Sequence, residues 1–397
     1  MERELISSQV KDLEEQLLTW RRHMHMHPEL SFQEYETSNY IESQLKSFGN
    51  DIEISRPTKT SVMAVIKGSK PGRTIALRAD IDALPIQETN DLPFASVNPG
   101  VMHACGHDGH AAILLAVAKL ISGIKDSLSG EVRLFFQHAE EVPPGGASEM
   151  LKAGVMDGVE EVYGLHISSN YKTCTFGLRS GALTSATDRF DIVIKGKGGH
   201  SAFPEECVDP VVVGAQIITA LQTIISRQTA AIDPAVLSIC KVNAGQAYNI
   251  IPGTMTLSGS TRTFNHETRE NLPKRMEQII KGITDAYHAD YEFSFDKGYG
   301  SVINDAELTK HVEELLTGHF GKERVAEIDP LMPGEDFAVF SAVCPGCFIE
   351  LGALNPEKKC DSPHHNCNYR MDEDALVYGV EYFVLLIKDR LSGSEKG

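Results

Sequence analysis

The chain has 397 residues, of which 42% are hydrophobic and 23% are charged, as is ordinary for a soluble globular protein. This length exceeds one ordinary hydrophobic core and predicts two domains. The 55 acidic and 37 basic residues give a formal net charge of −18, which argues against a nucleic acid or an anionic membrane as partner, because phosphate binding needs clustered lysine and arginine.

The acidic, helix-like start lacks the basic and apolar regions of a signal peptide, and no apolar run approaches the ~18 residues of a membrane span. The 8 cysteines in so long a chain do not indicate a disulfide framework. We therefore expect a cytoplasmic protein with reduced thiols and no membrane partner.

The first third of the chain alternates helix-like and strand-like patterns. Residues 5–27 predict an amphipathic helix that ends before Pro28, and residues 109–124 predict a buried helix. Strands are predicted at 61–68, 74–85, 130–137 and 160–167. This alternation favours an α/β sheet that is at least partly parallel.

From about Thr184 the pattern changes. Six segments follow in the order β-α-β-β-α-β, which predicts a ferredoxin-like unit. These segments cover residues 188–198, 209–226, 235–245, 253–264, 266–288 and 289–298.

After Ile303 the α/β pattern resumes. The periodicity predicts a helix at 305–320, a strand at 347–354 and a final helix at 372–391. We therefore expect a compact domain, residues 184–302, inserted into a larger one. The larger α/β domain would consist of residues 1–183 and 303–397.

Candidate metal ligands and acids follow several of the predicted strands. In open α/β sheets, ligands bind outside the carboxyl ends of the strands, so residues far apart in sequence are expected to meet there. A thiolate and an imidazole two residues apart, as in CGHDGH at 105–110, can bind one metal ion at ~2.3 Å and ~2.0 Å respectively. The candidates are Asp80, Cys105, His107, His110, Glu140, Glu141, His166, His364 and His365.

Eight motifs together resemble the M20 metallopeptidases, specifically the branch of N-acyl-amino-acid amidohydrolases, hippurate hydrolases and auxin-conjugate hydrolases. They occur in family order between residues 77 and 376, and cover essentially the whole chain. The motifs are LRADIDALPI, MHACGHDGH, HAEEVPPGGASEM, GLHI, GKGGHSAFP, NIIPGTMTLSGSTRTF, PGEDF and HHNCNYRMDEDAL. Arg78 stands where the peptidase branches carry a histidine ligand, which favours the amidohydrolase branch.

The resemblance implies a zinc-peptidase-like catalytic α/β domain with an inserted ferredoxin-like lid, through which the protein would form a homodimer. It also implies two divalent metal ions per subunit, bridged by Cys105. His107 and His166 would complete one metal position, and Glu141 and His365 the other. Mixed sulfur, nitrogen and oxygen ligands admit zinc, manganese, cobalt or nickel.

The remaining implied roles concern catalysis and substrate binding. Glu140 would bind no metal and would act as general base, passing a proton from water to the departing amine. Asp80 is expected to orient a histidine ligand. In the lid, His200 would polarise the scissile carbonyl, and the substrate carboxylate would be held by Asn249 and Arg262.

The implied reaction is hydrolysis of an N-acyl amino acid to a carboxylic acid and a free amino acid. A dipeptidase or carboxypeptidase of the same fold is one alternative, and differs by a free α-amino group on the acyl side of the bond. A non-catalytic metal- or thiol-responsive binding protein is the other, although binding alone needs no base such as Glu140. CPGC resembles a redox motif, and together with two further cysteines it could form a structural zinc site, but a proline-glycine turn explains it more simply. These cysteines are Cys344, Cys347, Cys360 and Cys367.

Overall fold

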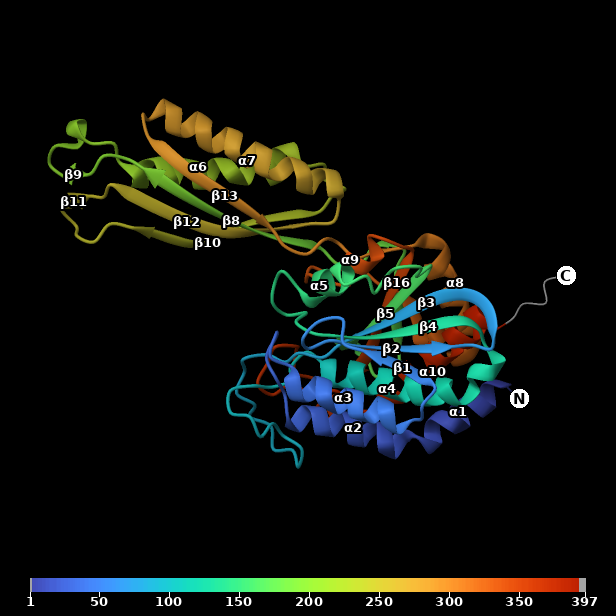
Figure 1. The fold of residues 1–397 in the computed structure, drawn as a ribbon. Helices are drawn as coiled ribbons and strands as arrows, with labels where there is room; N and C mark the ends of the chain where they lie inside the picture. The colour runs from blue at the N-terminus through green and yellow to red at the C-terminus, as the bar shows by residue number, and fades with distance from the viewer. Residues whose placement is uncertain (1, 393–397) are drawn as a thin grey trace. The chain divides into compact units, whose positions relative to one another are not determined.

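The computed structural model describes residues 2–392, and the chain forms two compact units, shown in Figure 1. Unit 1 comprises Met1–Leu183, Val302–Asp329 and Asp336–Gly397, and unit 2 comprises Thr184–Ser301 and Pro330–Glu335. The sequence places 330–335 in the α/β domain, but the backbone of this segment pairs with the start of unit 2. The Ser185 amide, for example, donates to the Leu331 carbonyl at 2.9 Å.

An eight-stranded mixed sheet forms the centre of unit 1. Its inner strands β4, β3, β5 and β16 are parallel, so their carboxyl ends share one edge. In spatial order the strands are β1 (Ile52–Ser55), β2 (Val62–Lys67), β4 (Ser129–Gln137), β3 (Lys70–Asp80), β5 (Glu161–Lys172), β16 (Gly346–Leu354), β6 (Phe176–Leu178) and β15 (Val325–Glu327). His166 lies inside β5 rather than at its predicted end, because pairing with β16 continues to Lys172.

Helices cover both faces of this sheet (Figure 1). The buried helix α4 (His107–Ile124) and α10 (Asp374–Leu391) pack on one face, and the short helices α5 (Gly146–Lys152) and α9 (Ala338–Ser341) lie over the other. The predicted helix at 5–27 is two helices interrupted at Leu13. The remaining α-helices of unit 1 are α1 (Glu2–Asp12), α2 (Glu14–Met26), α3 (Tyr35–Ser47) and α8 (Ala306–Phe320).

Unit 2 contains the six elements in the order that the periodicity predicts. They are β8 (Ala186–Lys195), α6 (Pro210–Thr223), β10 (Ala235–Ala244), β12 (Thr254–Thr263), α7 (His266–Ala286) and β13 (Asp290–Lys297). The strands form an antiparallel sheet in the order β10-β12-β8-β13. Both helices pack on it around Phe190, Ile217 and Met276, which are all fully buried. A small ladder, β9 (Gly199–His200) with β11 (Ile250–Ile251), extends from this sheet.

One described segment has the length and composition of a membrane span, contrary to the expectation from sequence. The helical stretch Pro210–Gln228 has a mean hydropathy of 1.2. Its residues Val213, Ile217 and Leu221 are buried in the core of unit 2. The core helix of a soluble protein has this same composition, so a single such helix is weak support for membrane insertion.

Candidate metal centre

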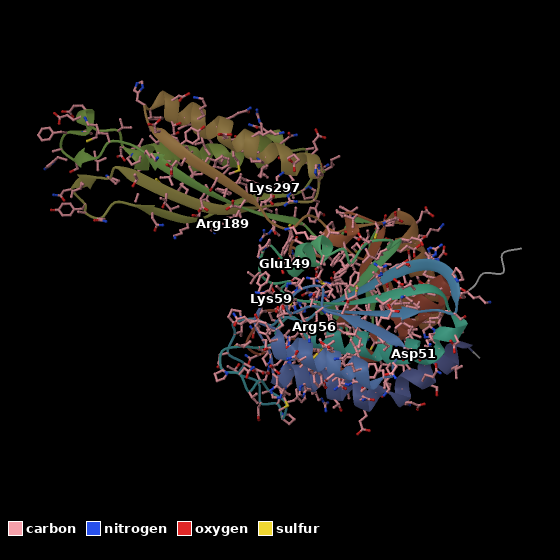
Figure 2. All side chains as sticks on the ribbon, in the orientation of Figure 1. Asp51, Arg56, Lys59, Glu149, Arg189 and Lys297 are labelled. Atoms are coloured by element: carbon pink, nitrogen blue, oxygen red, sulfur yellow. The ribbon has the colours of Figure 1, made fainter. Side chains whose placement is uncertain are left out.

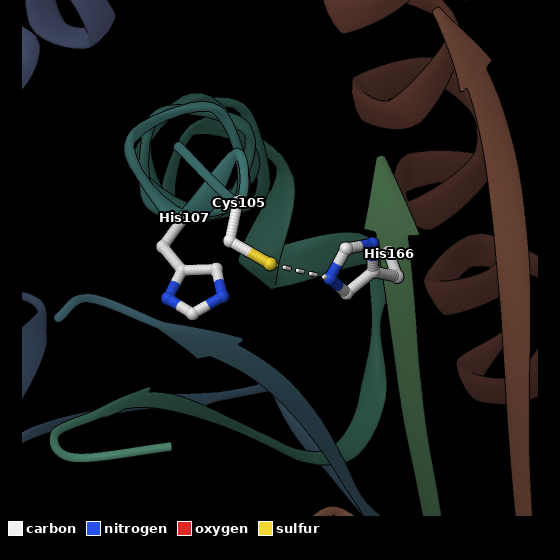
Figure 3. A group of neighbouring side chains, drawn as sticks. All are labelled: Cys105, His107 and His166. Carbon is white, nitrogen blue, oxygen red and sulfur yellow. Dashed lines mark hydrogen bonds between the residues drawn. The ribbon is translucent and has the colours of Figure 1, made fainter. Parts of the chain in front are cut away.

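The loop before α4 carries Cys105, and His107 is the first residue of α4; both lie beside His166 of β5. Gly106, between them, adopts a left-handed conformation with φ of 96°, and a Cβ there would lie 3.1 Å from the Tyr369 hydroxyl. Figure 3 shows the side chains of Cys105, His107 and His166 directed toward one another. The Cys105 Sγ atom lies 3.5 Å from His166 Nε2, and the three potential ligand atoms lie within 4.8 Å of one another.

A second group of potential ligands shares the same thiol. Atoms of Cys105, Glu141 and His365 also lie within 4.8 Å of one another, and His365 Nε2 is 3.2 Å from Glu141 Oε1. The His365 amide donates to the Ala104 carbonyl at 2.8 Å, which fixes this loop beside the Cys105 loop. His364 points elsewhere, since its Nε2 accepts from the Ser169 amide. The structure therefore brings together all five predicted ligands in two groups.

The orientation of the His107 ring suits a cation. Its Nδ1 donates to the carbonyl oxygen of Asp82 at 2.9 Å and lies 3.2 Å from Oδ1 of the same residue. The other ring nitrogen, Nε2, is buried and makes no hydrogen bond. Buried polar atoms without a partner are rare in proteins, and a divalent cation bound at His107 Nε2 would satisfy this one. The donor set therefore fits metal ions.

The pKa values of the candidate ligands also favour a bound cation. Burial and the nearby Glu141 carboxylate raise the pKa of the Cys105 thiol well above its usual value, so a bound cation is needed to form the thiolate. Burial and the neighbouring His110 hold the pKa of His166 well below its usual value, which keeps this imidazole neutral. Burial opposes the charge on His107, yet the carboxylates of Asp80 and Asp82 raise its pKa to about 10. A cation would displace that proton.

The two aspartates of LRADIDALPI hold different histidines. Asp80, which is expected to orient a ligand, accepts from His110 Nδ1 at 2.5 Å, while its Oδ2 lies 3.6 Å from His107 Nε2. The ring of His110 in turn accepts the Ile167 amide at 2.8 Å, beside His166. Asp82, which the sequence reasoning missed, is the residue that orients His107.

Arg78 occupies the position of a histidine ligand in the peptidase branches, and it is fully buried. Its guanidinium donates to Asp80 at 2.6 Å, to Asp336 at 2.7 Å and to Gln137 at 2.8 Å. A buried cation paired in this way is a structural support for Asp80 rather than a metal ligand.

Glu140, the predicted base, is 7% exposed, and one of its carboxylate oxygens lies within 4.8 Å of ligand atoms of His107 and Glu141. His138, two residues before Glu140, points away from the metal ligands, since its Nε2 lies 3.1 Å from the carboxylate of Glu149, which is labelled in Figure 2. Glu140 and Glu141 therefore serve the site from adjacent positions after β4.

The predicted substrate residues all lie in unit 2, but not together. His200 lies on the β9–β11 ladder and Asn249 immediately precedes β11; both are exposed, and the Ser201 amide donates to the Asn249 carbonyl. The ladder precedes the start of β12 at Thr254, whereas Arg262 lies near the end of this strand. A strand of 10 residues spans roughly 30 Å. Asn249 and Arg262 of one chain therefore cannot hold the same carboxylate.

The four C-terminal cysteines form no metal site within residues 2–392. None of them belongs to a group of three close potential ligands among the described residues. Burial raises the pKa of Cys344 to about 11 and of Cys347 to about 12, which favours unreactive thiols.

A buried thiol shared by two groups of histidine and carboxylate ligands, with a further carboxylate beside them, defines a candidate two-metal hydrolase centre. The chain belongs to peptidase family M20/M25/M40, whose sequence profile matches residues 76–389.

Individual relatives cover most of the chain. An N-acyl-L-amino acid amidohydrolase from Geobacillus stearothermophilus is 52% identical over 77% of this chain and 82% of its own length. Thermostable carboxypeptidase 2 from Saccharolobus solfataricus is 40% identical over 96% of this chain and 97% of its own length. Among solved structures, the YXEP protein of Bacillus subtilis, a dinuclear metal-binding peptidase of the M20 family, matches with a TM-score of 0.84 and 38% identity, covering 96% of this chain and 99% of that one.

Proposed function

We propose that this protein is a metal-dependent amidohydrolase that cleaves N-acyl amino acids to a carboxylic acid and a free amino acid. The observation that carries this proposal is the pair of ligand groups that share Cys105, with Glu140 beside both. The amidohydrolase from Geobacillus stearothermophilus and an N-acetylcysteine deacetylase from Bacillus subtilis, at 52% and 41% identity, support it.

Each residue has a defined task in this reaction. Cys105, His107, His166, Glu141 and His365 would hold two divalent ions, which supply Lewis-acid polarisation of the amide carbonyl and acidify water when bound. Glu140 accepts the proton of the attacking water and delivers it to the amine nitrogen as the C–N bond breaks. His200 stabilises the oxyanion, and Arg262 or Asn249 binds the carboxylate of the amino acid.

We further propose that unit 2 is a ferredoxin-like lid that joins two subunits as a homodimer. The separation of Asn249 and Arg262 along β12 supports this, because both can serve one substrate carboxylate only if they come from different chains. Strand β10 lies at the outer edge of the sheet and exposes Val236 and Val242, and α6 exposes Val211 and Val212. Exposed apolar side chains on an edge strand are typical of a paired surface.

The metal identity and the compartment are further proposals. Zinc, manganese, cobalt and nickel all suit the mixed donor set. All 8 cysteines are unpaired, in keeping with a reducing cytoplasm.

A carboxypeptidase is the second candidate, favoured by the 40% identity to the enzyme of Saccharolobus solfataricus. Amino-acid release from N-acetyl and N-benzoyl amino acids and from unblocked dipeptides separates the two, when measured in reductant with manganese, cobalt or zinc. Metal-dependent release from the blocked substrates supports the amidohydrolase. Release from unblocked dipeptides alone would replace it by the peptidase.

Replacing the base tests the mechanism. In Glu140→Gln we expect kcat to fall by about 10²- to 10⁴-fold, since the amide takes no proton from water, while the metal content stays as in the wild type. Metal content is measured by elemental analysis and kcat with the best blocked substrate. Glu277→Gln, at an exposed position of α7, is the matched control. Unchanged turnover in Glu140→Gln would exclude Glu140 as the base.

A further inference from the structure

We infer that Glu34 is a positioning residue for the general base: its buried carboxylate holds the Ala139 amide and so sets the direction of Glu140. This role rests on the proposed function. Glu34 lies immediately before α3, far from the metal ligands in sequence, and its side chain is completely buried. Its Oε1 accepts the Phe32 amide at 2.9 Å and the Ala139 amide at 2.8 Å.

The backbone of Ala139 needs such a partner. Its φ of 49° lies in the left-handed region, which residues with a Cβ rarely adopt unless the surroundings hold them there. Phe32, whose amide shares the same oxygen, also has a positive φ, of 65°. One oxygen of Glu34 therefore fixes two turns that local preference alone would not form.

The carbonyl group of Ala139 is hydrogen-bonded as well. Its carbonyl accepts the Gly146 amide at 3.0 Å, and a Cβ on Gly146 would lie 1.9 Å from the His138 carbonyl oxygen. The residue that precedes the base is thus bonded through both its amide and its carbonyl. A shift of this residue would move the Glu140 carboxylate relative to the two ligand groups.

A different carboxylate accepts the amide of Glu141, two residues after Ala139. Asp82 Oδ2 accepts the Glu141 amide at 3.0 Å and the Ser31 hydroxyl at 2.7 Å. Asp82 also orients His107, so it contacts two predicted ligands. Glu34 forms no hydrogen bond with His107 or with Glu141, and its bond to the Ala139 amide lies next to the general base Glu140. Loss of Glu34 should therefore affect proton transfer and leave metal binding intact.

Glu34 acts as a hydrogen-bond acceptor, and this role does not require a negative charge. Burial and the nearby Asp82 raise the pKa of Glu34 to about 7, and an oxygen of the neutral acid still accepts a hydrogen bond. Glutamine keeps that oxygen, whereas methionine has similar length and no strong acceptor. This contrast separates hydrogen bonding from the filling of space.

The test compares Glu34→Met and Glu34→Gln in the metal-loaded full chain, with Glu36→Met at an exposed position of α3 as control. We expect Glu34→Met to lower kcat about 10- to 100-fold, with KM and metal affinity unchanged, because the base is displaced. Hydrogen exchange of the 138–142 backbone, measured by mass spectrometry, should become faster in this variant. Glu34→Gln should stay within about threefold of the wild type in both readouts.

Four outcomes would overturn the inference: wild-type kcat in Glu34→Met, loss of metal in parallel with kcat, equal impairment of Glu34→Gln, or rapid exchange at Ala139 in the wild type. The last applies even if Glu34→Met does not fold. Failure of the proposed function looks different, since the wild type would then release no amino acid from any substrate while the exchange measurement stayed interpretable.

Discussion

Asp82 fixes the orientation of the His107 imidazole through its Nδ1 atom. Two oxygens of Asp82 lie within hydrogen-bond distance of Nδ1, and the buried Nε2 faces Glu141 at 3.9 Å from its Oε1. Because Asp82 also accepts the Glu141 amide, one carboxylate orients a ligand of each predicted metal position. Such partners of ligating residues tune both geometry and basicity.

Asp82→Asn tests this arrangement. The amide of asparagine cannot accept at both of its terminal atoms, so either the His107 contact or the Glu141 and Ser31 bonds are lost. We expect the affinity for at least one of the two ions to fall by about 10- to 100-fold. Competition with a chelator measures the two dissociation constants, and Asp91→Asn, at an exposed site, is the control. Unchanged affinities would show that Asp82 has no part in metal binding.

Residue chemistry explains what the sequence could and could not predict at the site. The five ligands and Glu140 stand out because the motifs carry distinctive side chains in family order. Glu34 and Asp82 act on backbone amides 105 and 59 positions away, and such pairs leave no local pattern. The alternation Asp80-Ile81-Asp82 was a usable signal, since residues two apart at a strand end point to the same side.

Helix α4 is the element that links the site to the core. All of its residues from His107 to Ala118 are buried, and its first turn faces β5 and the chain before α10. A Cβ at Gly109 would lie 2.5 Å from Ile167 Cδ1, 3.0 Å from Met371 Sδ and 3.1 Å from Leu376 Cδ2. The close approach of the helix to β5 thus requires glycine there.

Two glycines of α4 give a matched pair of substitutions. Gly109→Ala should lower the free energy of unfolding, because overpacking costs ~1–3 kcal/mol and the gain in helix propensity is only ~1 kcal/mol. Gly123→Ala should raise it by up to ~1 kcal/mol, since a Cβ there meets no atom within 4 Å. Denaturant unfolding of both variants measures the difference. A stabilising effect of Gly109→Ala would mean that α4 and β5 separate easily.

Elements with clear periodicity were predictable, and short or mixed ones were not. The six elements of unit 2 and helices α4, α8 and α10 follow their hydrophobic patterns. Helix α3 buries the polar side chains of Thr37 and Ser38, which hides its amphipathic face, and α5 has only 7 residues. The extension of β5 past His166 depends on pairing with β16, about 180 positions later, which no local pattern encodes.

At the scale of the whole molecule, the proposed dimer requires that the edge strand β10 pairs with a second chain. Val242→Lys places a charge on the exposed edge strand, where Val242 is 51% exposed, and should shift the protein to monomers at micromolar concentration. Activity should fall with the dimer if the partner completes the site. Sedimentation velocity measures the state, and Val343→Lys, at a site in unit 1 that is 53% exposed, is the control. A Val242→Lys protein that sediments as the wild type does would exclude pairing through β10.

The position of β16 in the sheet has a consequence for synthesis. This strand lies between β5 and β6, yet it is made after the whole of unit 2, and His365 is made later still. On the ribosome, unit 2 can complete its fold while the sheet of unit 1 still lacks an inner strand. The emerging chain then carries Cys105, His107, His166 and Glu141 but not His365, so we expect the two metal positions to be completed in a fixed order, the one without His365 first.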